Sequence, residues 1–322
     1  MNPQRSWTGG LTRRAVLRLG AGAIAAGIAG CGSGEYAGPA RTLRIAAGER
    51  GGFYVEFAEL LAGQLDRALG AIVVGTKGSA QNLGLLRTGG ADLALALADI
   101  ARGAAEGRVG FGEPLPVRAI GRVYENYMQL VVLADSPVAS VADLAGRRVS
   151  LGADGSGAAI FGARLFDAAD VAAAIEHNTL ATAVERLGSG RVDALLWSGG
   201  VPTPALTQLA AAHPIRLIDL TDHLPALRAD HDPAYHRVTV PAGSYGATRP
   251  VETVGVANLL VTTPDLPDAV AAAVARTLVR SAPRLIPPSA LGTQYLDLRS
   301  LIVTSGIRLH PGAAAAYREL RR

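Results

Sequence analysis

Short apolar runs alternate along the chain with stripes of apolar residues at helical spacing. Buried strands are predicted at 42–47, 72–74 and 149–151, each followed by a glycine-rich turn. Helical patterning follows each turn, and after the first turn six apolar residues between Phe53 and Leu69 fall on one helical face. The alternation of strand, turn and helix predicts an α/β protein.

Further elements follow the same pattern. Glycine, proline and clusters of polar residues separate the apolar segments. Residues 224–235 are polar and contain proline, so we expect a loop there, and Asp135-Ser136-Pro137 predicts a break between two parts of the fold. The other predicted helices cover 80–88, 158–169, 203–212, 265–279 and 309–322, and the other predicted strands cover 93–98, 119–123, 130–133, 194–197, 215–220 and 254–261.

One spacing occurs twice. The pattern Leu-x-x-Gly-x-x-Asp spans 86–92 and again 187–193, and in both places an apolar run follows. It is typical of a helix that ends at glycine and leads into a buried strand. The repetition predicts two related lobes, with residues 42–132 and 256–322 in lobe 1 and residues 133–255 in lobe 2.

Three turns share the pattern G-x-x-G-[GS], at 48–52, 75–79 and 152–156. In an open α/β sheet such turns lie at the carboxyl edge of the strands, and the free backbone N–H groups of the following helix suit an anion. Ser79 and Ser156 can add hydroxyl groups there. The alternative interpretation is ordinary helix capping, with glycine chosen for turn geometry.

Charged and aromatic residues complete the set of candidates. Lys77 is the only lysine of the chain and lies in the second turn; it could supply a cation to an acidic ligand, or be a solvated loop charge. Aromatic residues after strands or glycine turns could wall a pocket or pack in the core. The candidate ligand-binding residues are Arg50, Tyr54, Thr76, Lys77, Gly78, Ser79, Asn82, Asp99, Tyr124, Ser156, Trp197 and Tyr245.

The first thirty residues have the features of an export signal. Residues 12–18 (TRRAVLR) resemble a twin-arginine signal, and residues 28–31 (IAGC) resemble a bacterial lipobox. Cleavage before Cys31 would leave a lipid on its thiol, and residues 31–41 would form a flexible tether. The alternative is an uncleaved apolar tail in which Cys31, the only cysteine, stands by chance.

Removing the signal changes the charge balance. Residues 1–30 contain four arginines and no acidic residue, so the 31 basic residues of the chain fall to 27, equal to the 27 acidic residues. A basic excess on the folded domain is what nucleic-acid binding requires, so we expect no nucleic-acid partner. With no second cysteine, an intrachain disulfide is excluded.

Catalytic patterns are sparse. The turns match neither a Walker loop nor the G-x-G-x-x-G fingerprint, and no G-x-S-x-G elbow occurs. His231 and His236 lack the H-E-x-x-H spacing; with His223, Asp222 and Asp230 they could form a loop metal site, although a solvated polar loop explains them as well. We therefore expect no catalysis, cofactor or metal, with a secreted hydrolase that uses this loop as the remote alternative.

The ordered motifs resemble a known family. From about Thr42 to Glu319 the chain is similar to the TAXI-type solute receptors of tripartite ATP-independent periplasmic (TRAP) transporters. The motifs that carry this resemblance are Gly51-Gly52-Phe53-Tyr54, Thr76-Lys77-Gly78-Ser79-x-x-Asn82, Gly89-x-x-Asp92-Leu93-Ala94, Leu144-x-Gly146-x-Arg148-Val149-Ser150-Leu151-Gly152-x-x-Gly155-Ser156-Gly157, Gly190-x-Val192-Asp193-Ala194, Pro241-x-Gly243-x-Tyr245, Leu309-His310-Pro311-Gly312-Ala313 and Tyr317-Arg318-Glu319.

The resemblance implies a two-lobe, type II periplasmic-binding-protein fold that closes on a small carboxylate, such as glutamate or 2-oxoglutarate, and delivers it to membrane subunits. The family usually has small hydroxyl residues where Glu49 and Arg50 stand here. We therefore expect an exported, lipid-anchored, monomeric receptor on the outer face of the cell membrane or facing the periplasm. The alternative is a receptor for an ABC importer or a sensor kinase.

Overall fold

The computed structural model describes residues 36–322, which form one compact unit from Tyr36 to Arg322. The predicted signal, the lipidation site Cys31 and the start of the tether lie outside the described residues. None of the helices within 36–322 is long and apolar enough to cross a membrane.

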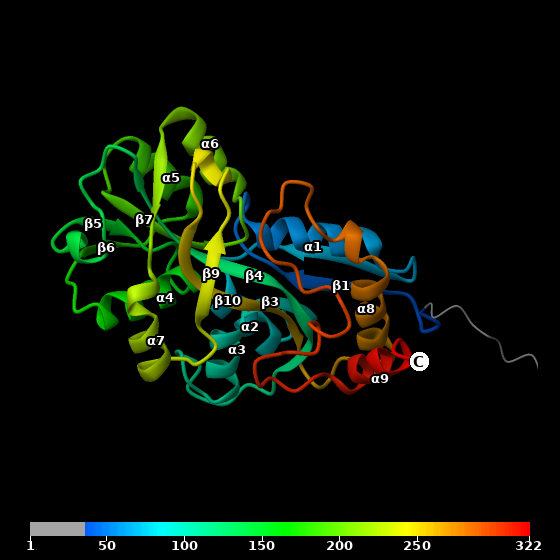
Figure 1. Cartoon of the computed structure of the whole chain (residues 1–322). Helices are drawn as coiled ribbons and strands as arrows, with labels where there is room; N and C mark the ends of the chain where they lie inside the picture. Colours follow the sequence, from blue (N-terminus) through cyan, green and yellow to red (C-terminus); the bar gives the residue numbers. More distant parts are fainter. Residues whose placement is uncertain (1–35) are drawn as a thin grey trace, which may run out of the picture. The chain divides into compact units, whose positions relative to one another are not determined.

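One sheet organises the described chain (Figure 1). Its main path runs β2-β1-β3-β10-β4-β7-β5-β6, while β8 pairs with β4 and β9 pairs with β10. The strands are β1 (Arg41–Ala46), β2 (Leu69–Val74), β3 (Leu93–Leu97), β4 (Arg118–Leu133), β5 (Arg148–Ser150), β6 (Ala174–Glu176), β7 (Ala194–Gly199), β8 (Ile215–Ile218), β9 (His236–Val240) and β10 (Val251–Thr262).

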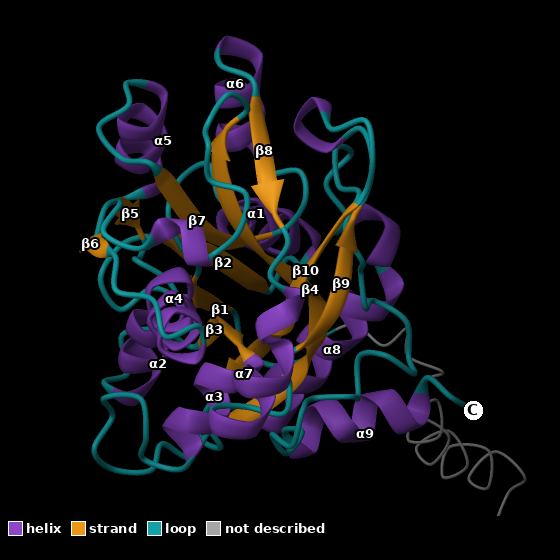
Figure 2. Cartoon of the chain, turned by 60° about the vertical axis from the view of Figure 1, so that its left-hand side comes forward, coloured by secondary structure: helices purple, strands orange, loops and turns teal. Residues whose placement is uncertain are grey.

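The sheet has a parallel group of strands at each end. Strand β1 pairs in parallel with β2 and β3, and β5 pairs in parallel with β6 and β7. The long antiparallel strands β4 and β10 lie between the two groups, and β9 lies beside β10 (Figure 2). We call the part built on β1–β3 lobe 1 and the part built on β5–β8 lobe 2.

Strand β4 connects the lobes without a break. It pairs with β10 as far as Tyr127 and with β7 from Tyr127 to Val131. The expectation of two strands, at 119–123 and 130–133, was therefore wrong. Glu125 and Asn126 interrupt the apolar pattern, but both are buried and hydrogen-bonded, so the strand continues through them. The chain thus passes from β10 pairing to β7 pairing within β4, before the predicted break at 135–137.

The helices cover both lobes. Lobe 1 carries α1 (Phe53–Gln64), α2 (Ser79–Arg87), α3 (Ala98–Ala105), α8 (Asp268–Arg280) and α9 (Pro311–Glu319). Lobe 2 carries α4 (Gly157–Ala168), α5 (Leu180–Gly188), α6 (Pro204–Ala212) and α7 (Leu224–Asp230).

Two local expectations need correction. The apolar stripe after Phe53 does not continue to Leu69, because α1 ends at Gln64 and Leu69 begins β2. Residues 224–235 are not simply a loop, since α7 covers the first seven of them. Pro225 lies in the first turn of α7, where its missing N–H has no helical partner to lose.

The repeated Leu-x-x-Gly-x-x-Asp motif makes the same contacts in both lobes. Asp92 accepts a hydrogen bond from the backbone N–H of Arg44 at 2.8 Å, and Asp193 accepts one from the N–H of Arg148 at 2.9 Å. The arginine side chain in each case donates to the carbonyl of the motif's glycine. Each aspartate thus joins the start of its own strand to the neighbouring strand.

The lobes share a hydrophobic core. One cluster of buried side chains includes Leu97 and Ile100 from lobe 1 together with Phe161 and Leu196 from lobe 2. A second cluster lies mainly between α1, α8 and the lobe 1 strands. The lobes are therefore packed against one another in this conformation.

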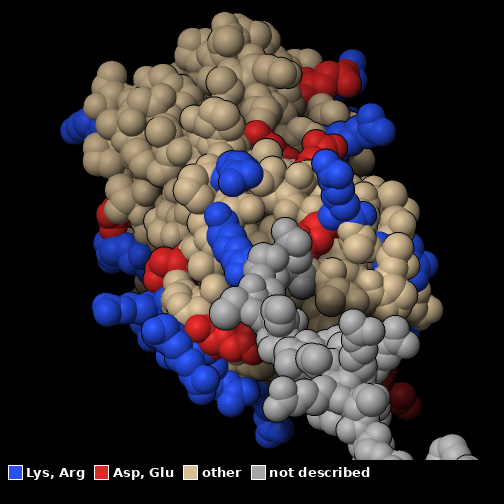
Figure 3. Space-filling view, turned by 90° about the vertical axis from the view of Figure 1, so that its right-hand side faces the viewer, with Lys and Arg blue, Asp and Glu red and all other residues tan. Residues whose placement is uncertain are grey.

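Charged side chains are unevenly spread over the face drawn in Figure 3. On the face shown in Figure 3, basic side chains gather along one edge with acidic side chains among them, and large areas carry neither. Arg41 and Arg44, for example, both pair with Asp92.

Candidate functional site

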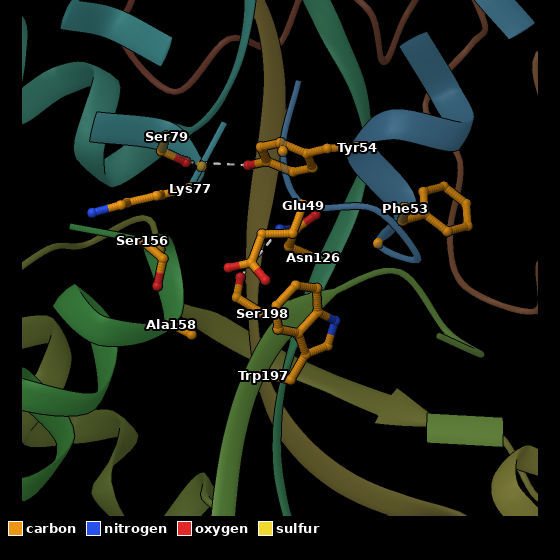
Figure 4. Close-up of a pocket in the computed structure, with 14 residues that line it drawn as sticks. Glu49, Phe53, Tyr54, Lys77, Ser79, Asn126, Ser156, Ala158, Trp197 and Ser198 are labelled. Atoms are coloured by element: carbon orange, nitrogen blue, oxygen red, sulfur yellow. Dashed lines mark hydrogen bonds between the residues drawn. The ribbon is translucent and has the colours of Figure 1, made fainter. Parts of the chain in front are cut away.

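A cavity lies where the N-terminal ends of α1, α2 and α4 meet the end of β7 (Figure 4). The volume of the cavity that a water molecule can occupy is about 30 Å³. A larger solute would therefore enter only if the walls moved apart. Its lining residues are Gly48, Glu49, Gly52, Phe53, Tyr54, Lys77, Gly78, Ser79, Asn126, Ser156, Gly157, Ala158, Trp197 and Ser198.

Helix N-termini from both lobes form much of the wall. The N-cap residues of α1 and α2 are Gly52 and Gly78, which have no side chain to cap their helices. In lobe 2, Ser156 caps α4, where its Oγ accepts a hydrogen bond from Ala159 N at 3.1 Å. The remaining amides of these first turns have no partner within their helices, and a helix N-terminus favours negative charge. The walls are therefore suited to an anion.

The lobes approach closely at this cavity. Gly78 has φ 123°, a conformation that favours glycine, and a Cβ atom on it would lie 3.7 Å from the Cα of Ser156. A Cβ atom on Gly157 would lie 2.6 Å from Cδ1 of Leu97. The small residues of the second and third turns allow the lobes to meet.

Tyr54 and Ser79 form a hydrogen-bonded pair on the lobe 1 side. Their side-chain oxygens lie 3.2 Å apart, and Ser79 Oγ also accepts a hydrogen bond from Leu97 N at 3.1 Å. Burial raises the pKa of Tyr54, so its hydroxyl stays protonated and able to donate. These hydrogen bonds fix the two side chains at the N-terminus of α2.

Glu49 extends from the first turn into the cavity and reaches the other lobe. Its Oε2 accepts a hydrogen bond from Leu180 N, at the N-terminus of α5, at 2.6 Å. Its Oε1 is buried and has no hydrogen-bond partner in the described chain. Burial raises the pKa of Glu49, and the Leu180 hydrogen bond opposes this effect.

Asn126 and Ser198 were absent from the candidate residues. Asn126 Nδ2 donates to Ser198 Oγ at 3.1 Å, while Asn126 Oδ1 is buried with no partner among residues 36–322. The sequence feature that could have identified Asn126 is an amide side chain in the middle of an apolar strand. Glu49 was noted only as a departure from the family pattern. Ser198 gave no signal beyond its place after Trp197.

The structure brings six of the twelve candidate residues together around the cavity. They are Tyr54, Lys77, Gly78, Ser79, Ser156 and Trp197.

Two other candidates support the cavity from behind. Thr76 Oγ1 donates to Asn82 Oδ1 at 2.5 Å and accepts a hydrogen bond from Gly78 N. Asn82 Nδ2 donates to the carbonyls of Ala47 and Leu95. These bonds tie the second turn to β1 and β3, so Thr76 and Asn82 fix the position of the turn without lining the cavity.

Two further candidates lie elsewhere in the core. Tyr124 packs against Phe53, with ring centroids 4.7 Å apart. The Tyr245 hydroxyl accepts a hydrogen bond from Thr203 N and donates one to Gln129. Both side chains are buried away from the cavity lining.

Asp99 also lies away from the cavity, at a second contact between the lobes. Its Oδ2 accepts hydrogen bonds from Arg164 Nη1 at 2.7 Å and from the Tyr235 hydroxyl at 2.8 Å. Burial raises the pKa of Asp99, and the Arg164 guanidinium opposes this effect. Asp99 thus joins α3 of lobe 1 to α4 of lobe 2.

The two candidate cations lie at the mouth. Arg50 and Lys77 line an open hollow of about 510 Å³ that also touches Thr179 and Ala181 at the start of α5. Lys77 contributes to both the hollow and the cavity, and its ammonium points away from Glu49 (Figure 4).

Two histidines of the 223–236 segment each lie near a single carboxylate. Within the described part of the chain, no group of three or more His, Cys, Asp or Glu side chains is placed to hold a metal ion. His236 Nε2 lies 3.1 Å from Glu125 Oε2, and His231 Nε2 lies 3.7 Å from Asp167 Oδ2.

The two parallel strand groups, joined by β4 and β10 around a cavity, define the predicted α/β, two-lobe, type II periplasmic-binding-protein fold. The chain belongs to the NMT1-like family, whose model matches residues 45–320.

Several solved structures are similar to this chain. A protein from Bordetella bronchiseptica RB50 is similar with a TM-score of 0.54 and 16% identity, over 87% of this chain and 98% of that one. A structure described as a periplasmic transporter has a TM-score of 0.51 and 14% identity, over 88% and 93%. The periplasmic aliphatic sulphonate binding protein SsuA from Escherichia coli has a TM-score of 0.46 and 18% identity, over 87% and 83%.

Proposed function

We propose that this protein is an exported solute receptor of the TAXI type, which captures a small carboxylate between its lobes and performs no chemistry. One observation carries the proposal: the N-termini of α1 and α2 from lobe 1 and of α4 from lobe 2 converge on a single cavity. A carboxylate held there would accept hydrogen bonds from amides of both lobes.

Binding and closure are coupled in this proposal. The cavity is too small for a solute with several heavy atoms, so the lobes must separate before entry. A ligand that contacts both lobes binds the closed form more tightly and shifts the population toward it. Strands β4 and β10, which serve both lobes, are the segments where such a hinge would bend.

The proposed partners follow from this receptor function. Arg50 and Lys77 attract the anion at the mouth, and the closed receptor then delivers it to TRAP membrane subunits. A lipid on Cys31 would keep the receptor at the membrane surface, with residues 31–41 as the tether between lipid and fold.

A thermal-shift screen of the purified protein tests this function. A ligand that binds only the folded state raises the melting temperature, and a concentration of 100 times Kd adds about 2.7 kcal/mol of stability. We expect at least one amino acid, keto acid or dicarboxylate to give a saturable rise. If no member of the panel raises the melting temperature, the small-carboxylate assignment is wrong.

Serine variants test the helix-terminus site. Ser79→Ala and Ser156→Ala should each weaken binding roughly 5-fold to 10-fold, since each removes a hydroxyl from the wall. Ser189→Ala, on the exposed end of α5, is the matched control and should bind as the wild type does. Unchanged affinity in both cavity variants would remove the proposed site.

A further inference from the structure

Two oxygen atoms in the cavity wall lack a donor. Glu49 Oε1 and Asn126 Oδ1 are both buried, and neither has a hydrogen-bond partner among the described residues. Asn126 is only 1% exposed and lines the cavity together with Glu49. An acceptor left unpaired in a buried place costs free energy, which a ligand that donates hydrogen bonds would recover.

The charge of Glu49 is also unmatched by any side chain. Its one hydrogen bond comes from the amide of Leu180, and no Lys, Arg or His within 36–322 forms an ion pair with it. The Lys77 ammonium, the nearest candidate in the lining, points away from it (Figure 4). A positive charge brought by the solute would therefore be favoured beside Glu49.

The two sides of the cavity differ in the hydrogen-bonding groups that they present. Lys77, Ser79, Ser156 and Ala158 lie on one side in Figure 4, at the N-termini of α2 and α4, where backbone amides donate. Glu49 lies across from them with Asn126, where oxygens accept. A solute that fits this polarity carries an anionic group at one end and a donor at the other.

We infer that Glu49 and Asn126 form a subsite for the protonated amine of the solute, so that the receptor selects small zwitterions with a carboxylate and an ammonium group. This inference rests on the proposed function and narrows its substrate class. A dicarboxylate or a keto acid would place an oxygen against Glu49 Oε1 and leave that acceptor unpaired, which disfavours its binding.

Calorimetric titration with matched pairs of solutes tests the subsite. L-alanine and pyruvate form one pair, and L-glutamate and 2-oxoglutarate form the other; the members of each pair differ by an amine in place of a keto oxygen. We expect the wild type to bind the amine of at least one pair at least about tenfold more tightly than its keto partner. A difference of this size corresponds to one hydrogen bond to a charged group.

Two variants assign the preference to the subsite. Glu49→Gln keeps the shape of the side chain and the oxygen that accepts from Leu180 N. Its affinity for the amine should fall roughly 10-fold to 100-fold, while its affinity for the keto acid should change little. Asn126→Leu should lose roughly 10-fold for the amine. Glu59→Gln, an exposed residue of α1, removes one carboxylate from the same lobe and should keep the wild-type preference.

The outcomes separate the two proposals. Equal or tighter binding of the keto acids by the wild type would overturn the amine subsite while leaving the carboxylate receptor in place. A preference that survives both in Glu49→Gln and in Asn126→Leu, with each variant shown to be folded by its melting transition, would overturn it as well. If the wild type binds neither amine while a solute without an amine raises its melting temperature, the amine subsite is overturned and the carboxylate receptor stands. If no member of the thermal-shift panel binds, the proposed function fails and this inference fails with it.

Discussion

The lobes contact one another through two carboxylates of lobe 1 that have different surroundings. Asp99 is 2% exposed and meets the guanidinium of Arg164, while Glu49 is partly exposed and meets only the amide of Leu180. The first charge is matched by a cation, and the second is not. The difference indicates that the Asp99 contact holds the lobes together, whereas Glu49 keeps one oxygen without a hydrogen-bond partner in the described chain.

A second ion pair strengthens the contact at Asp99. Arg102, one turn further along α3, pairs with the buried carboxylate of Asp232 in the segment before β9. Both pairs lie beside the shared hydrophobic cluster that includes Ile100 and Tyr235. The three interactions together fix α3 of lobe 1 against lobe 2.

The largest expected effect comes from breaking the Asp99 contact. Asp99→Ala leaves the Arg164 guanidinium, whose side chain is only 15% exposed, without its carboxylate partner, and breaking such a pair typically costs about 3–5 kcal/mol of unfolding free energy. Urea denaturation measures this cost. Glu185→Ala, which breaks an exposed pair with Arg191, is the control and should cost about 1 kcal/mol or less. Equal costs for the two variants would show that Asp99 does not hold the lobes.

A methyl group between the lobes should have the next largest effect. In Gly157→Ala the new Cβ would lie 2.6 Å from Leu97 Cδ1, so packing strain of about 1–3 kcal/mol is expected. Gly84→Ala on α2, where no atom lies within 4 Å, should instead stabilise by about 1 kcal/mol because alanine favours a helix. Denaturation of both variants checks the difference, and a stabilising Gly157→Ala would contradict the close approach.

The pH dependence of Glu49 gives a smaller effect. Because burial raises its pKa in the folded state above the usual value of 4.5, its favourable contribution is present below that value and is lost as the pH rises through the folded-state pKa. The stability of Glu49→Gln relative to the wild type should therefore increase from pH 4 toward neutrality. Melting temperatures of both proteins between pH 4 and pH 8 measure this trend, and parallel curves would contradict it.

Glu252 supplies the opposite sign as a control. Hydrogen bonds from Arg237 and Thr239 lower its pKa, so its contribution is present above 4.5 and is lost as the pH falls through the folded-state pKa. Glu252→Gln should therefore lose stability relative to the wild type as the pH rises. If the stability of both variants relative to the wild type changed in the same direction with pH, burial would not be the factor that sets the pKa of Glu49.

Local patterns predicted the parts of the fold that depend on nearby residues. The strand and glycine-turn units and the repeated Asp92 and Asp193 motifs all depend on contacts within one lobe, and the sequence shows their spacing directly. The expectations failed where tertiary burial overrides the local pattern, as in β4, where Asn126 is polar but buried.

The site was harder to predict because it forms only when the lobes meet. The glycine turns and Ser79 indicated its position. The role of Glu49 depends on the distance to Leu180, more than a hundred residues away in the chain, and no local spacing encodes that distance.

The motif Leu309-His310-Pro311-Gly312-Ala313 has a structural role. His310 is the N-cap of α9, and Gly312 N donates to the side chains of both His310 and Asp268. A Cβ atom on Gly312 would collide with the backbone of Asp268, so only glycine allows α9 to pack this closely on α8.

The most direct test of the central claim, that the cavity between the lobes is the solute site, uses the fluorescence of Trp197. The chain has two tryptophans, Trp7 and Trp197, and Trp7 lies in the predicted export signal, so either cleavage before Cys31 or a Trp7→Phe background leaves the cavity residue as the only reporter. Titration with a solute that raises the melting temperature should change the emission along a saturable one-site curve whose Kd agrees with calorimetry. Calorimetric binding with no change in Trp197 emission would place the solute elsewhere and contradict the account.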